Sequence, residues 1–345
     1  MPSTVATIDA VDRAESGRPA EDALTRLVRL VDADLQECNR TIVANMNSDV
    51  ELIPQLAAHL VAAGGKRIRP LLTLAAARMC AYEGHRHIDL AACVEFIHTA
   101  TLLHDDVVDE SLLRRGLASA NAVFGNKASV LVGDFLFARA FQLMVADGSL
   151  KVLDILCRAS ATIAEGEVLQ LVTQNDLASG EAQYLQVIGG KTAALFTAAC
   201  EVGAVVADRP LAEEQALGQY GTALGMAFQL VDDALDYAAD QATLGKTVGD
   251  DFREGKVTLP VLLAYAAGDS EERAFWERTI DQSEQTDADL DHAMALIARH
   301  DCIGATLRRA AEFADQAKAS LSIFPASPYR DALVAVADYT VSRAS

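Results

Sequence analysis

Two short segments of the sequence each place three aspartates within one helical turn. They are LLHDDVVDE, with Asp105, Asp106 and Asp109, and QLVDDALDY, with Asp232, Asp233 and Asp236. In each segment the first and third aspartates are four positions apart, so on a helix they share a face. Three carboxylates on one turn repel one another, and a divalent cation relieves that repulsion. Mg²⁺ prefers oxygen ligands and completes its shell with substrate phosphates, so the segments predict metal sites around a diphosphate.

A solvated helix face is the alternative interpretation of either segment alone. The pattern occurs twice, however, and each time it follows an apolar run, HTATLLH in the first case and GMAFQLV in the second. A purely solvated face needs no such repetition beside apolar sequence. We therefore expect the two turns to face each other across a cleft.

Several cations stand beside glycines or acidic pairs rather than on polar helix faces. They are Lys66, Arg67 and Arg69 in GGKRIRP, Arg114 and Arg115 after the first aspartates, Lys191 in GGKTAALF, Lys246 in LGKTVGDD and Lys256 in REGKVTLP. The glycine turn in GGKRIRP precedes a helix that is predicted to start at Pro70, and backbone N–H groups and the helix dipole at such a start favour phosphate. A solvated surface position explains any one of these cations, but the group together predicts a diphosphate site.

The tripeptide GKT occurs at residues 190–192 and 245–247, which raises the alternative of a nucleotide-binding P-loop. That motif needs a glycine five positions before the glycine of GKT, and a preceding strand. Leu185 and Asp240 stand at those positions, and no strand pattern precedes either tripeptide. The sequence therefore excludes a P-loop.

Four histidines are candidates for a role at or near such a site. His98 lies seven residues, about two helical turns, before Asp105, although a hydrogen-bonding role in the core is the alternative. His104 adjoins the first cluster and could orient an aspartate. His85 and His87, in EGHRH, form a conceivable zinc pair, but a solvated loop is the favoured interpretation.

The elements that position these residues are predicted to be helices. The chain has 345 residues, 51% of them hydrophobic, and only 8 prolines, which favours helix and allows a sizeable core. Apolar residues recur at helical spacing from about residue 22, strand-like alternation is scarce, and the break at residues 110–126 is too short for a domain linker. We expect a mobile tail at residues 1–21, then one all-α bundle over 22–345 with ten or more helices around a central apolar cavity.

Composition also limits the partners and the compartment. The net charge of -20 repels a polyanion, so nucleic-acid binding is a poor hypothesis. The six cysteines show no CxxC spacing and suit buried thiols in a reducing compartment. The N-terminus is acidic without an apolar core, and the longest apolar stretches fall short of the roughly 18 residues of a membrane span. The sequence therefore predicts a cytoplasmic protein with at most peripheral membrane contact.

The motifs GGKRIRP, LLHDDVVDE with RRG, GKT, FQLVDDALDY and GKTVGDDFREGKVTLP resemble, in order and rough spacing, those of the polyprenyl synthetase family. The resemblance covers nearly the whole chain after residue 20 and is strongest with the long-chain members, such as octaprenyl, solanesyl and decaprenyl diphosphate synthases, which serve quinone side chains. It implies an isoprenoid synthase fold, a homodimer, three Mg²⁺ ions with substrate bound, and head-to-tail addition of isopentenyl diphosphate to farnesyl, geranyl or dimethylallyl diphosphate.

The resemblance also implies residue roles. The metal ligands are Asp105, Asp106, Asp109, Asp232, Asp233 and Asp236. The allylic diphosphate is held by Arg114, Lys191, Thr192, Gln229, Lys246 and Lys256. Isopentenyl diphosphate is held by Lys66, Arg69, His98 and Arg115.

Product length is expected to depend on the helix that carries Asp105. Ala100 and Thr101 lie about one turn before the aspartates, and their small side chains leave the route of a growing chain open, which predicts a long product of about eight to ten isoprene units. Phe137 and Phe141 are candidates for the floor of that route.

Four other functions compete with this interpretation. A shorter-chain farnesyl or geranylgeranyl diphosphate synthase shares every motif. A terpenoid cyclase or head-to-head synthase needs no second diphosphate pocket, which GGKRIRP and RRG indicate here. A non-catalytic partner subunit should have lost an aspartate cluster, and a purely structural bundle would not repeat one.

Overall fold

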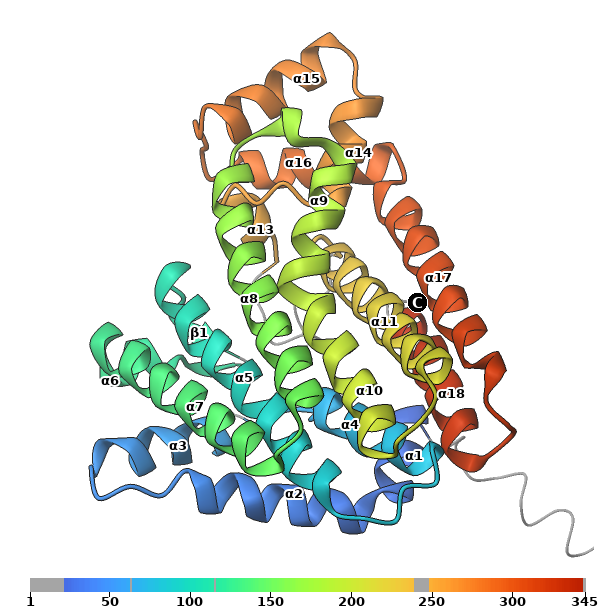
Figure 1. The fold of residues 1–345 in the computed structure, drawn as a ribbon. Coiled ribbons are helices and arrows are strands. Elements are labelled where there is room, and N and C mark those ends of the chain that lie inside the picture. The colour runs from blue at the N-terminus through green and yellow to red at the C-terminus, as the bar shows by residue number, and fades with distance from the viewer. Residues whose placement is uncertain (1–21, 63, 115, 239–247, 344–345) are drawn as a thin grey trace, which may run out of the picture.

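The structure is a computed structural model that describes residues 22–62, 64–114, 116–238 and 248–343, nearly all of them helical (Figure 1). Its N-terminal helices are α1 (Ala23–Leu30), α2 (Asp32–Asn45), α3 (Leu52–Ala62), α4 (Ile68–Met79) and α5 (Arg86–Val108). The middle of the chain forms α6 (Ala120–Phe124), α7 (Asn126–Asp147), α8 (Leu150–Thr173), η1 (Leu177–Ser179), α9 (Gly180–Ile188), the π-helical η2 (Gly189–Ala193), α10 (Ala194–Val206) and α11 (Leu211–Asp236). The C-terminal part forms α13 (Asp250–Arg253), α14 (Leu259–Ala267), α15 (Ser270–Trp276), η3 (Glu277–Asp281), α16 (Asp289–Arg299), α17 (Cys302–Ser320), η4 (Leu321–Ile323) and α18 (Pro328–Ser342). The predicted all-α class with ten or more helices is confirmed.

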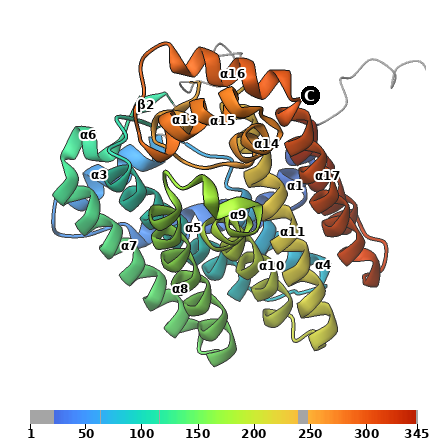
Figure 2. The same cartoon turned by 90° about the horizontal axis from the view of Figure 1, so that it is seen from above.

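Helix α10 lies at the centre of the bundle, in contact with α4, α5, α8 and α11 (Figure 2). Its sequence, ALFTAACEVGAVV, is apolar almost all round, as suits a helix covered on every side. Its small residues let the neighbours approach closely. A Cβ added to Gly203 would lie 2.6 Å from the Cβ of Ala76 on α4.

A smaller core lies beside the main one and includes the fully buried Trp276 with Phe252 and Tyr237. It is formed by α13–α16, which cover the upper end of the bundle in Figure 1. Helices α5 and α11, with 23 and 26 residues, both carry their aspartates at their C-terminal ends. The two helices and this cover together build the site described below.

Three local predictions were wrong. Within the break at residues 110–126, expected as loop, β1 (Leu113–Arg114) and β2 (Leu117–Ala118) pair as short antiparallel strands. Pro70 does not start its helix but occupies the third position of α4, where its missing N–H still costs no helical bond. His87 is not in a solvated loop: it is fully buried in α5, and its Nε2 lies 3.1 Å from Asp34 Oδ2.

The cysteines are all free, and all but Cys157 are buried, as predicted. Burial raises the pKa of the Cys80 thiol to about 12, so this thiol is protonated at neutral pH. The expectation about apolar stretches was wrong for α7. Among the described helices, α7 alone has the length and hydropathy of a membrane span, although 39% of its apolar window is buried inside the fold. It packs along α5, and its exposed face is considered below.

Candidate active site

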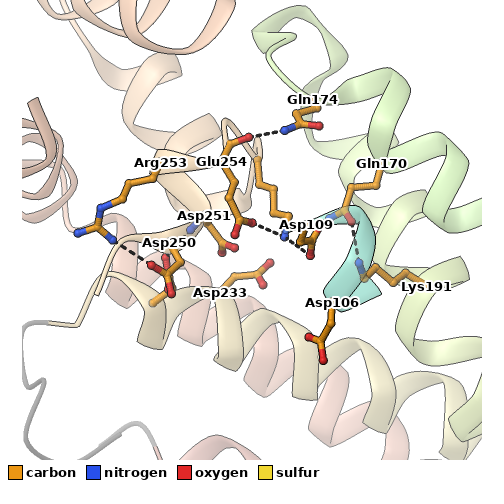
Figure 3. A network of polar contacts seen from close by, with 12 residues as sticks. Asp106, Asp109, Gln170, Gln174, Lys191, Asp233, Asp250, Asp251, Arg253 and Glu254 are labelled. Carbon is orange, nitrogen blue, oxygen red and sulfur yellow. Dashed lines mark hydrogen bonds and ion pairs between the residues drawn. The ribbon is translucent and has the colours of Figure 1, made fainter. Parts of the chain in front are cut away.

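The two aspartate clusters meet at one end of the bundle, where α5 and α11 both end (Figure 3). A helix C-terminus carries a partial negative charge, so carboxylates are unfavourable there unless cations accompany them. Lys256 is one such cation, because its Nζ lies 3.1 Å from Asp109 Oδ2 and 2.5 Å from Glu254 Oε2. Burial lowers the pKa of Lys256, but the carboxylates of Asp109, Glu254 and Asp251 raise it above its usual value. The lysine therefore keeps its charge between the clusters.

Asp106, the middle aspartate of the first cluster, is engaged by a neighbouring arginine. It is 2% exposed, its Oδ1 accepts a hydrogen bond from Arg114 Nε at 2.7 Å, and the same oxygen forms an ion pair with Arg114 Nη2 at 2.6 Å. Its backbone carbonyl accepts a hydrogen bond from Asn121 Nδ2 at 2.9 Å. The carboxylate thus holds Arg114, on the hairpin, against the end of α5.

Asp233, the middle aspartate of the second cluster, is also engaged by protein groups. It is 4% exposed and accepts hydrogen bonds from Tyr184 Oη at 2.5 Å and Gln229 Nε2 at 2.7 Å. The Gln229 carbonyl in turn accepts a hydrogen bond from Thr192 Oγ1 at 2.8 Å. Burial raises the pKa of Asp233 to about 6, although the two donors oppose the rise. The chain of bonds fixes Thr192 and Gln229 relative to α11.

The outer aspartates are more accessible. Burial, with help from Glu167 and Asp109, raises the pKa of Asp105 to about 7 against the opposing charge of Lys191. Asp232 Oδ1 lies 2.9 Å from Nη2 of Arg343, a residue that directly follows α18. These partly exposed carboxylates are the oxygens that the site presents to a ligand.

The segment GDDFREGK adds a carboxylate that sequence reasoning had not singled out. The backbone N–H of Asp251 donates to Asp236 Oδ2 at 3.1 Å, and Asp251 lies close to Asp233 and Asp109 (Figure 3). Burial, followed by the charges of Asp236 and Asp233, raises the pKa of Asp251 well above its usual value. Its position in the same short segment as Lys256 was the signal available in the sequence.

A cavity of about 100 Å³ lies beside these carboxylates and brings together residues from α8, α9, η2, α11 and the segment after α13. It is lined by, among others, Lys191, Thr192, Gln229, Asp233, Asp251 and Lys256. The predicted allylic-diphosphate residues Lys191, Thr192, Gln229 and Lys256 thus share one polar pocket. An apolar cavity through the centre of the bundle stays a prediction.

Lys191 reaches this pocket from the π-helical segment η2. Its Nζ donates to Glu167 Oε2 at 2.8 Å and to Gln170 Oε1 at 2.8 Å, both on α8 (Figure 3 shows Gln170 and Lys191). Glu167, Gln170 and Tyr184 had not been predicted as site residues. Single Glu, Gln and Tyr residues form no motif in the sequence, and only the packing of α8, α9 and η2 brings them to the lysine and to Asp233.

The basic residues of GGKRIRP separate into two groups. Arg69 Nη1 lies 3.1 Å from His98 Nε2, and its guanidinium stacks 4.5 Å from the centre of the Phe196 ring. Lys66 Nζ lies 5.6 Å from the centre of the Tyr339 ring. Arg67, by contrast, pairs with Glu95 at 2.6 Å. The structure thus brings Arg69 and His98 together as predicted, whereas Arg115 and Lys246 lie outside the described residues.

His104 and the proposed chain-length residues lie along α5 and α7. His104 faces α7 rather than the aspartates of the first cluster. Its Nε2 lies 3.2 Å from the Val130 carbonyl, and its ring stacks on Phe137 with 6.1 Å between the ring centres. Ala100 is fully buried, and Thr101 Oγ1 donates to the His98 carbonyl at 2.8 Å.

Of the two predicted floor residues, Phe137 is half-buried against the main core. Phe141 is 43% exposed, which argues against its place at the floor of an internal route. The spacing of four residues correctly placed both rings on one side of α7, but it could not predict how much of that side is exposed to solvent.

The carboxylates suit a hard divalent cation. Oxygen-only ligands such as Asp105, Asp109, Asp232 and Asp236 are those that Mg²⁺ prefers. Within the described ranges, no three His, Cys, Asp or Glu side chains are grouped to hold a metal by themselves. Mg²⁺ commonly takes part of its coordination shell from water and phosphate.

Known proteins resemble this chain in sequence and in fold. The model of the family described as polyprenyl synthetase matches residues 50–297. The chain is 49% identical over 321 residues to the octaprenyl diphosphate synthase of Haemophilus influenzae, covering 93% of this chain and 97% of that protein. It is 48% identical over 320 residues to the octaprenyl diphosphate synthase of Escherichia coli, with coverages of 93% and 99%.

Two solved structures extend the likeness to the backbone. A polyprenyl synthase from Caulobacter crescentus, complexed with calcium and isoprenyl diphosphate, superposes with a TM-score of 0.91 at 56% identity, covering 95% of this chain and 100% of that one. A decaprenyl diphosphate synthase from Rhodobacter capsulatus gives a TM-score of 0.90 at 53% identity, covering 93% and 99%. The chain therefore belongs to the polyprenyl synthetase family and, within it, to the long-chain trans-polyprenyl diphosphate synthases.

Proposed function

We propose that the site described above performs the Mg²⁺-dependent, head-to-tail condensation of isopentenyl diphosphate with an allylic diphosphate, namely farnesyl, geranyl or dimethylallyl diphosphate. The observation that carries the proposal is that Lys256, which pairs with Asp109 of the first cluster, lines one cavity together with Asp233 of the second cluster and with Lys191. Two opposed carboxylate turns with cations between them suit a diphosphate held through metal ions. Three Mg²⁺ ions with substrate bound would satisfy both turns.

Within each cluster, some aspartates are proposed to bind metal and the middle one to position neighbouring side chains. Asp105, Asp109, Asp232 and Asp236 hold the metal ions, since they are the more accessible members of each cluster. Asp106 keeps Arg114 in place, and Asp233 keeps the Gln229–Thr192 pair in place. Because the carboxylates of Asp106 and Asp233 already accept hydrogen bonds from protein donors, their effect on metal binding is mainly indirect.

Two sets of residues receive the two diphosphates. Arg114, Lys191, Thr192, Gln229, Lys246 and Lys256 hold the allylic diphosphate. Lys66, Arg69, His98 and Arg115 hold isopentenyl diphosphate. Of the first set, Lys191, Thr192, Gln229 and Lys256 line the cavity between α8 and α11. Of the second set, Arg69 lies in the first turn of α4. A guanidinium can only donate hydrogen bonds, so Arg69 is suited to diphosphate and makes His98 Nε2 an acceptor.

The chemistry begins with loss of the allylic diphosphate. Mg²⁺ held by the four outer aspartates would supply positive charge against this leaving group. Lys191, Lys256 and Arg114 donate to its oxygens as the allylic C–O bond breaks, and the electron pair leaves with the diphosphate. The double bond of isopentenyl diphosphate then forms the new C–C bond, and a proton passes to the departed diphosphate. Buried apolar side chains such as Ala100 and Leu103 keep water from the cation.

The product is proposed to contain about eight to ten isoprene units and to serve as the side chain of a respiratory quinone, with the enzyme in the cytoplasm. Ala100 supports the length, because a methyl group on the inner side of α5 leaves room for a chain that passes it. Incubation with farnesyl diphosphate, isopentenyl diphosphate and Mg²⁺, followed by dephosphorylation and chromatography, measures the product length. Products of fifteen or twenty carbons only would favour the shorter-chain alternative, and no turnover would favour a non-catalytic partner subunit.

The enzyme is proposed to work as a homodimer through the outer faces of α7 and α8, which lie side by side in both views (Figures 1 and 2). Exposed apolar side chains gather on these helices; they are Val130, Leu131, Phe141, Val145, Val168, Leu171 and Val172. A patch of this kind on a water-exposed surface marks an interface, and a second copy presents the same patch.

The dimer is tested by mass measurement during size-exclusion chromatography. The double variant Leu131→Glu, Val145→Glu should elute as a monomer. The variant Leu211→Glu is the matched control, because Leu211 is similarly exposed but lies at the start of α11, so it should leave the dimer intact. A dimeric double variant would place the interface elsewhere.

A further inference from the structure

Helix α8 and the segment η2 touch where two glycines face each other. A Cβ added to Gly166 would lie 2.5 Å from the backbone nitrogen of Lys191 and 2.8 Å from the carbonyl carbon of Gly190. A Cβ added to Gly190 would lie 3.1 Å from the Gly166 Cα and 3.1 Å from the Thr162 carbonyl oxygen. The first contact is closer than side chains allow and is made by backbone, which cannot turn aside. The approach of α8 to η2 therefore requires glycine at position 166.

The same stretch of α8 also holds the far end of Lys191. Glu167 and Gln170 accept hydrogen bonds from its ammonium, each at 2.8 Å. The neighbouring Thr192 points instead to α11, where it donates to Gln229. The π-helical conformation of η2 lets these consecutive residues serve two different helices. Helix α8 therefore contacts Lys191 at two places: Gly166 packs against its backbone, and Glu167 and Gln170 bind its ammonium.

We propose that Gly166 is a positioning residue for Lys191: its missing side chain sets how deeply the lysine ammonium enters the diphosphate pocket. The inference rests on the proposed role of Lys191 in holding the allylic diphosphate. A methyl group at position 166 must push η2 away by about 1 Å to restore an ordinary contact, and a displacement of that size costs on the order of 100-fold in rate when it misplaces a catalytic group.

A graded series of alanine substitutions tests the geometry. Gly166→Ala, with its 2.5 Å contact, should raise the KM for the allylic diphosphate and lower kcat, by roughly 10- to 100-fold in kcat/KM, while the KM for isopentenyl diphosphate stays near wild type. Gly190→Ala, with contacts of 3.1 Å, should show the same pattern more weakly. Gly218→Ala is the matched control, because its Cβ would meet Thr197 at an ordinary 3.8 Å, and it should leave all constants unchanged.

If Gly166→Ala folds poorly, Gly190→Ala still tests the proposal, because it perturbs the same contact more mildly. Equal changes in the KM of both substrates, or the same loss in Gly218→Ala, would indicate general destabilisation and overturn the proposal.

A double-mutant cycle with Lys191→Ala separates this inference from the function on which it rests. If Gly166 acts through Lys191, adding Gly166→Ala to Lys191→Ala should cause little further loss. A full additional loss overturns the positioning role while leaving the Lys191 assignment intact. If Lys191→Ala by itself leaves the KM for the allylic diphosphate unchanged, the assignment of Lys191 fails and the inference fails with it.

Discussion

Replacement of Ala100 by phenylalanine should shorten the product from about eight to ten isoprene units to three or four. Ala100 is fully buried on α5, five residues before Asp105, and therefore lies about 7.5 Å further into the bundle at 1.5 Å per residue. An aromatic ring at that depth occupies the space through which a growing chain must pass. Because both substrates are proposed to bind at the aspartate end, their KM values should change little.

Ala100→Phe should also destabilise the fold, and this effect must be measured separately from the blocking of the route. Forcing a ring into a packed core destabilises a protein by about 1–3 kcal/mol. Ala337→Phe is the matched control, because Ala337 is equally buried but lies in α18, which packs on α1 and α17. Both variants should lose a similar amount of thermal stability.

The assay is chromatography of the dephosphorylated products, with isopentenyl diphosphate in excess and with thermal unfolding measured in parallel. Only Ala100→Phe should shorten the chain. A long product from a folded Ala100→Phe enzyme would refute the route along α5. Equal shortening by Ala337→Phe would show that loss of stability, rather than a plug, limits the chain.

Three further predictions concern the charged groups of the site. Asp105→Ala and Asp232→Ala should each lower turnover by several orders of magnitude with helical circular dichroism unchanged, and near wild-type activity of either variant would contradict the two-cluster mechanism. Asp251→Asn should raise the Mg²⁺ concentration for half-maximal rate by about tenfold, because it removes a buried carboxylate that interacts with the charges of Asp236 and Asp233, and an unchanged Mg²⁺ titration would remove Asp251 from the site. Arg114→Ala should raise mainly the KM for the allylic diphosphate and Arg115→Ala that for isopentenyl diphosphate, whereas equal effects on both substrates would mean that the division is wrong.

The response to pH when metal is removed follows from Asp105. Because burial raises its pKa to about 7, its neutral form stabilises the fold at low pH, and this contribution is lost as the pH rises from about 4 to about 7. In EDTA, Asp105→Asn should therefore unfold at a higher temperature than wild type at pH 8, with a smaller difference at pH 5.5. A difference that does not depend on pH would exclude titration of Asp105 as the cause.

The parts of the site that could be predicted from the sequence are those set by local spacing. Asp105 and Asp109, like Asp232 and Asp236, share a helix face because they are four apart, and the structure places both clusters at helix ends that meet. The helical class followed from periodic apolar residues, which act within a few turns.

The parts that could not be predicted depend on contacts between distant segments. Asp233 became a scaffold residue because Tyr184, 49 positions earlier, donates to it. His87 looked like a loop residue, yet its ring is buried against Asp34, 53 positions away. Phe141 sits on the exposed side of α7, which only the packing of α7 on α5 decides. No spacing rule contains this information.

The contact between Arg343 and Asp232 bears on how the enzyme should be prepared. The guanidinium lies 2.9 Å from the carboxylate, also donates to the Phe228 carbonyl at 3.0 Å, and sits 4.2 Å from the centre of that ring. An affinity tag fused directly after Ser345 would be separated from this arginine by only two residues. A C-terminal polyhistidine tag would therefore bring imidazoles, which themselves bind divalent metals, close to a proposed magnesium ligand. Removal of such a tag before each metal titration avoids that artefact.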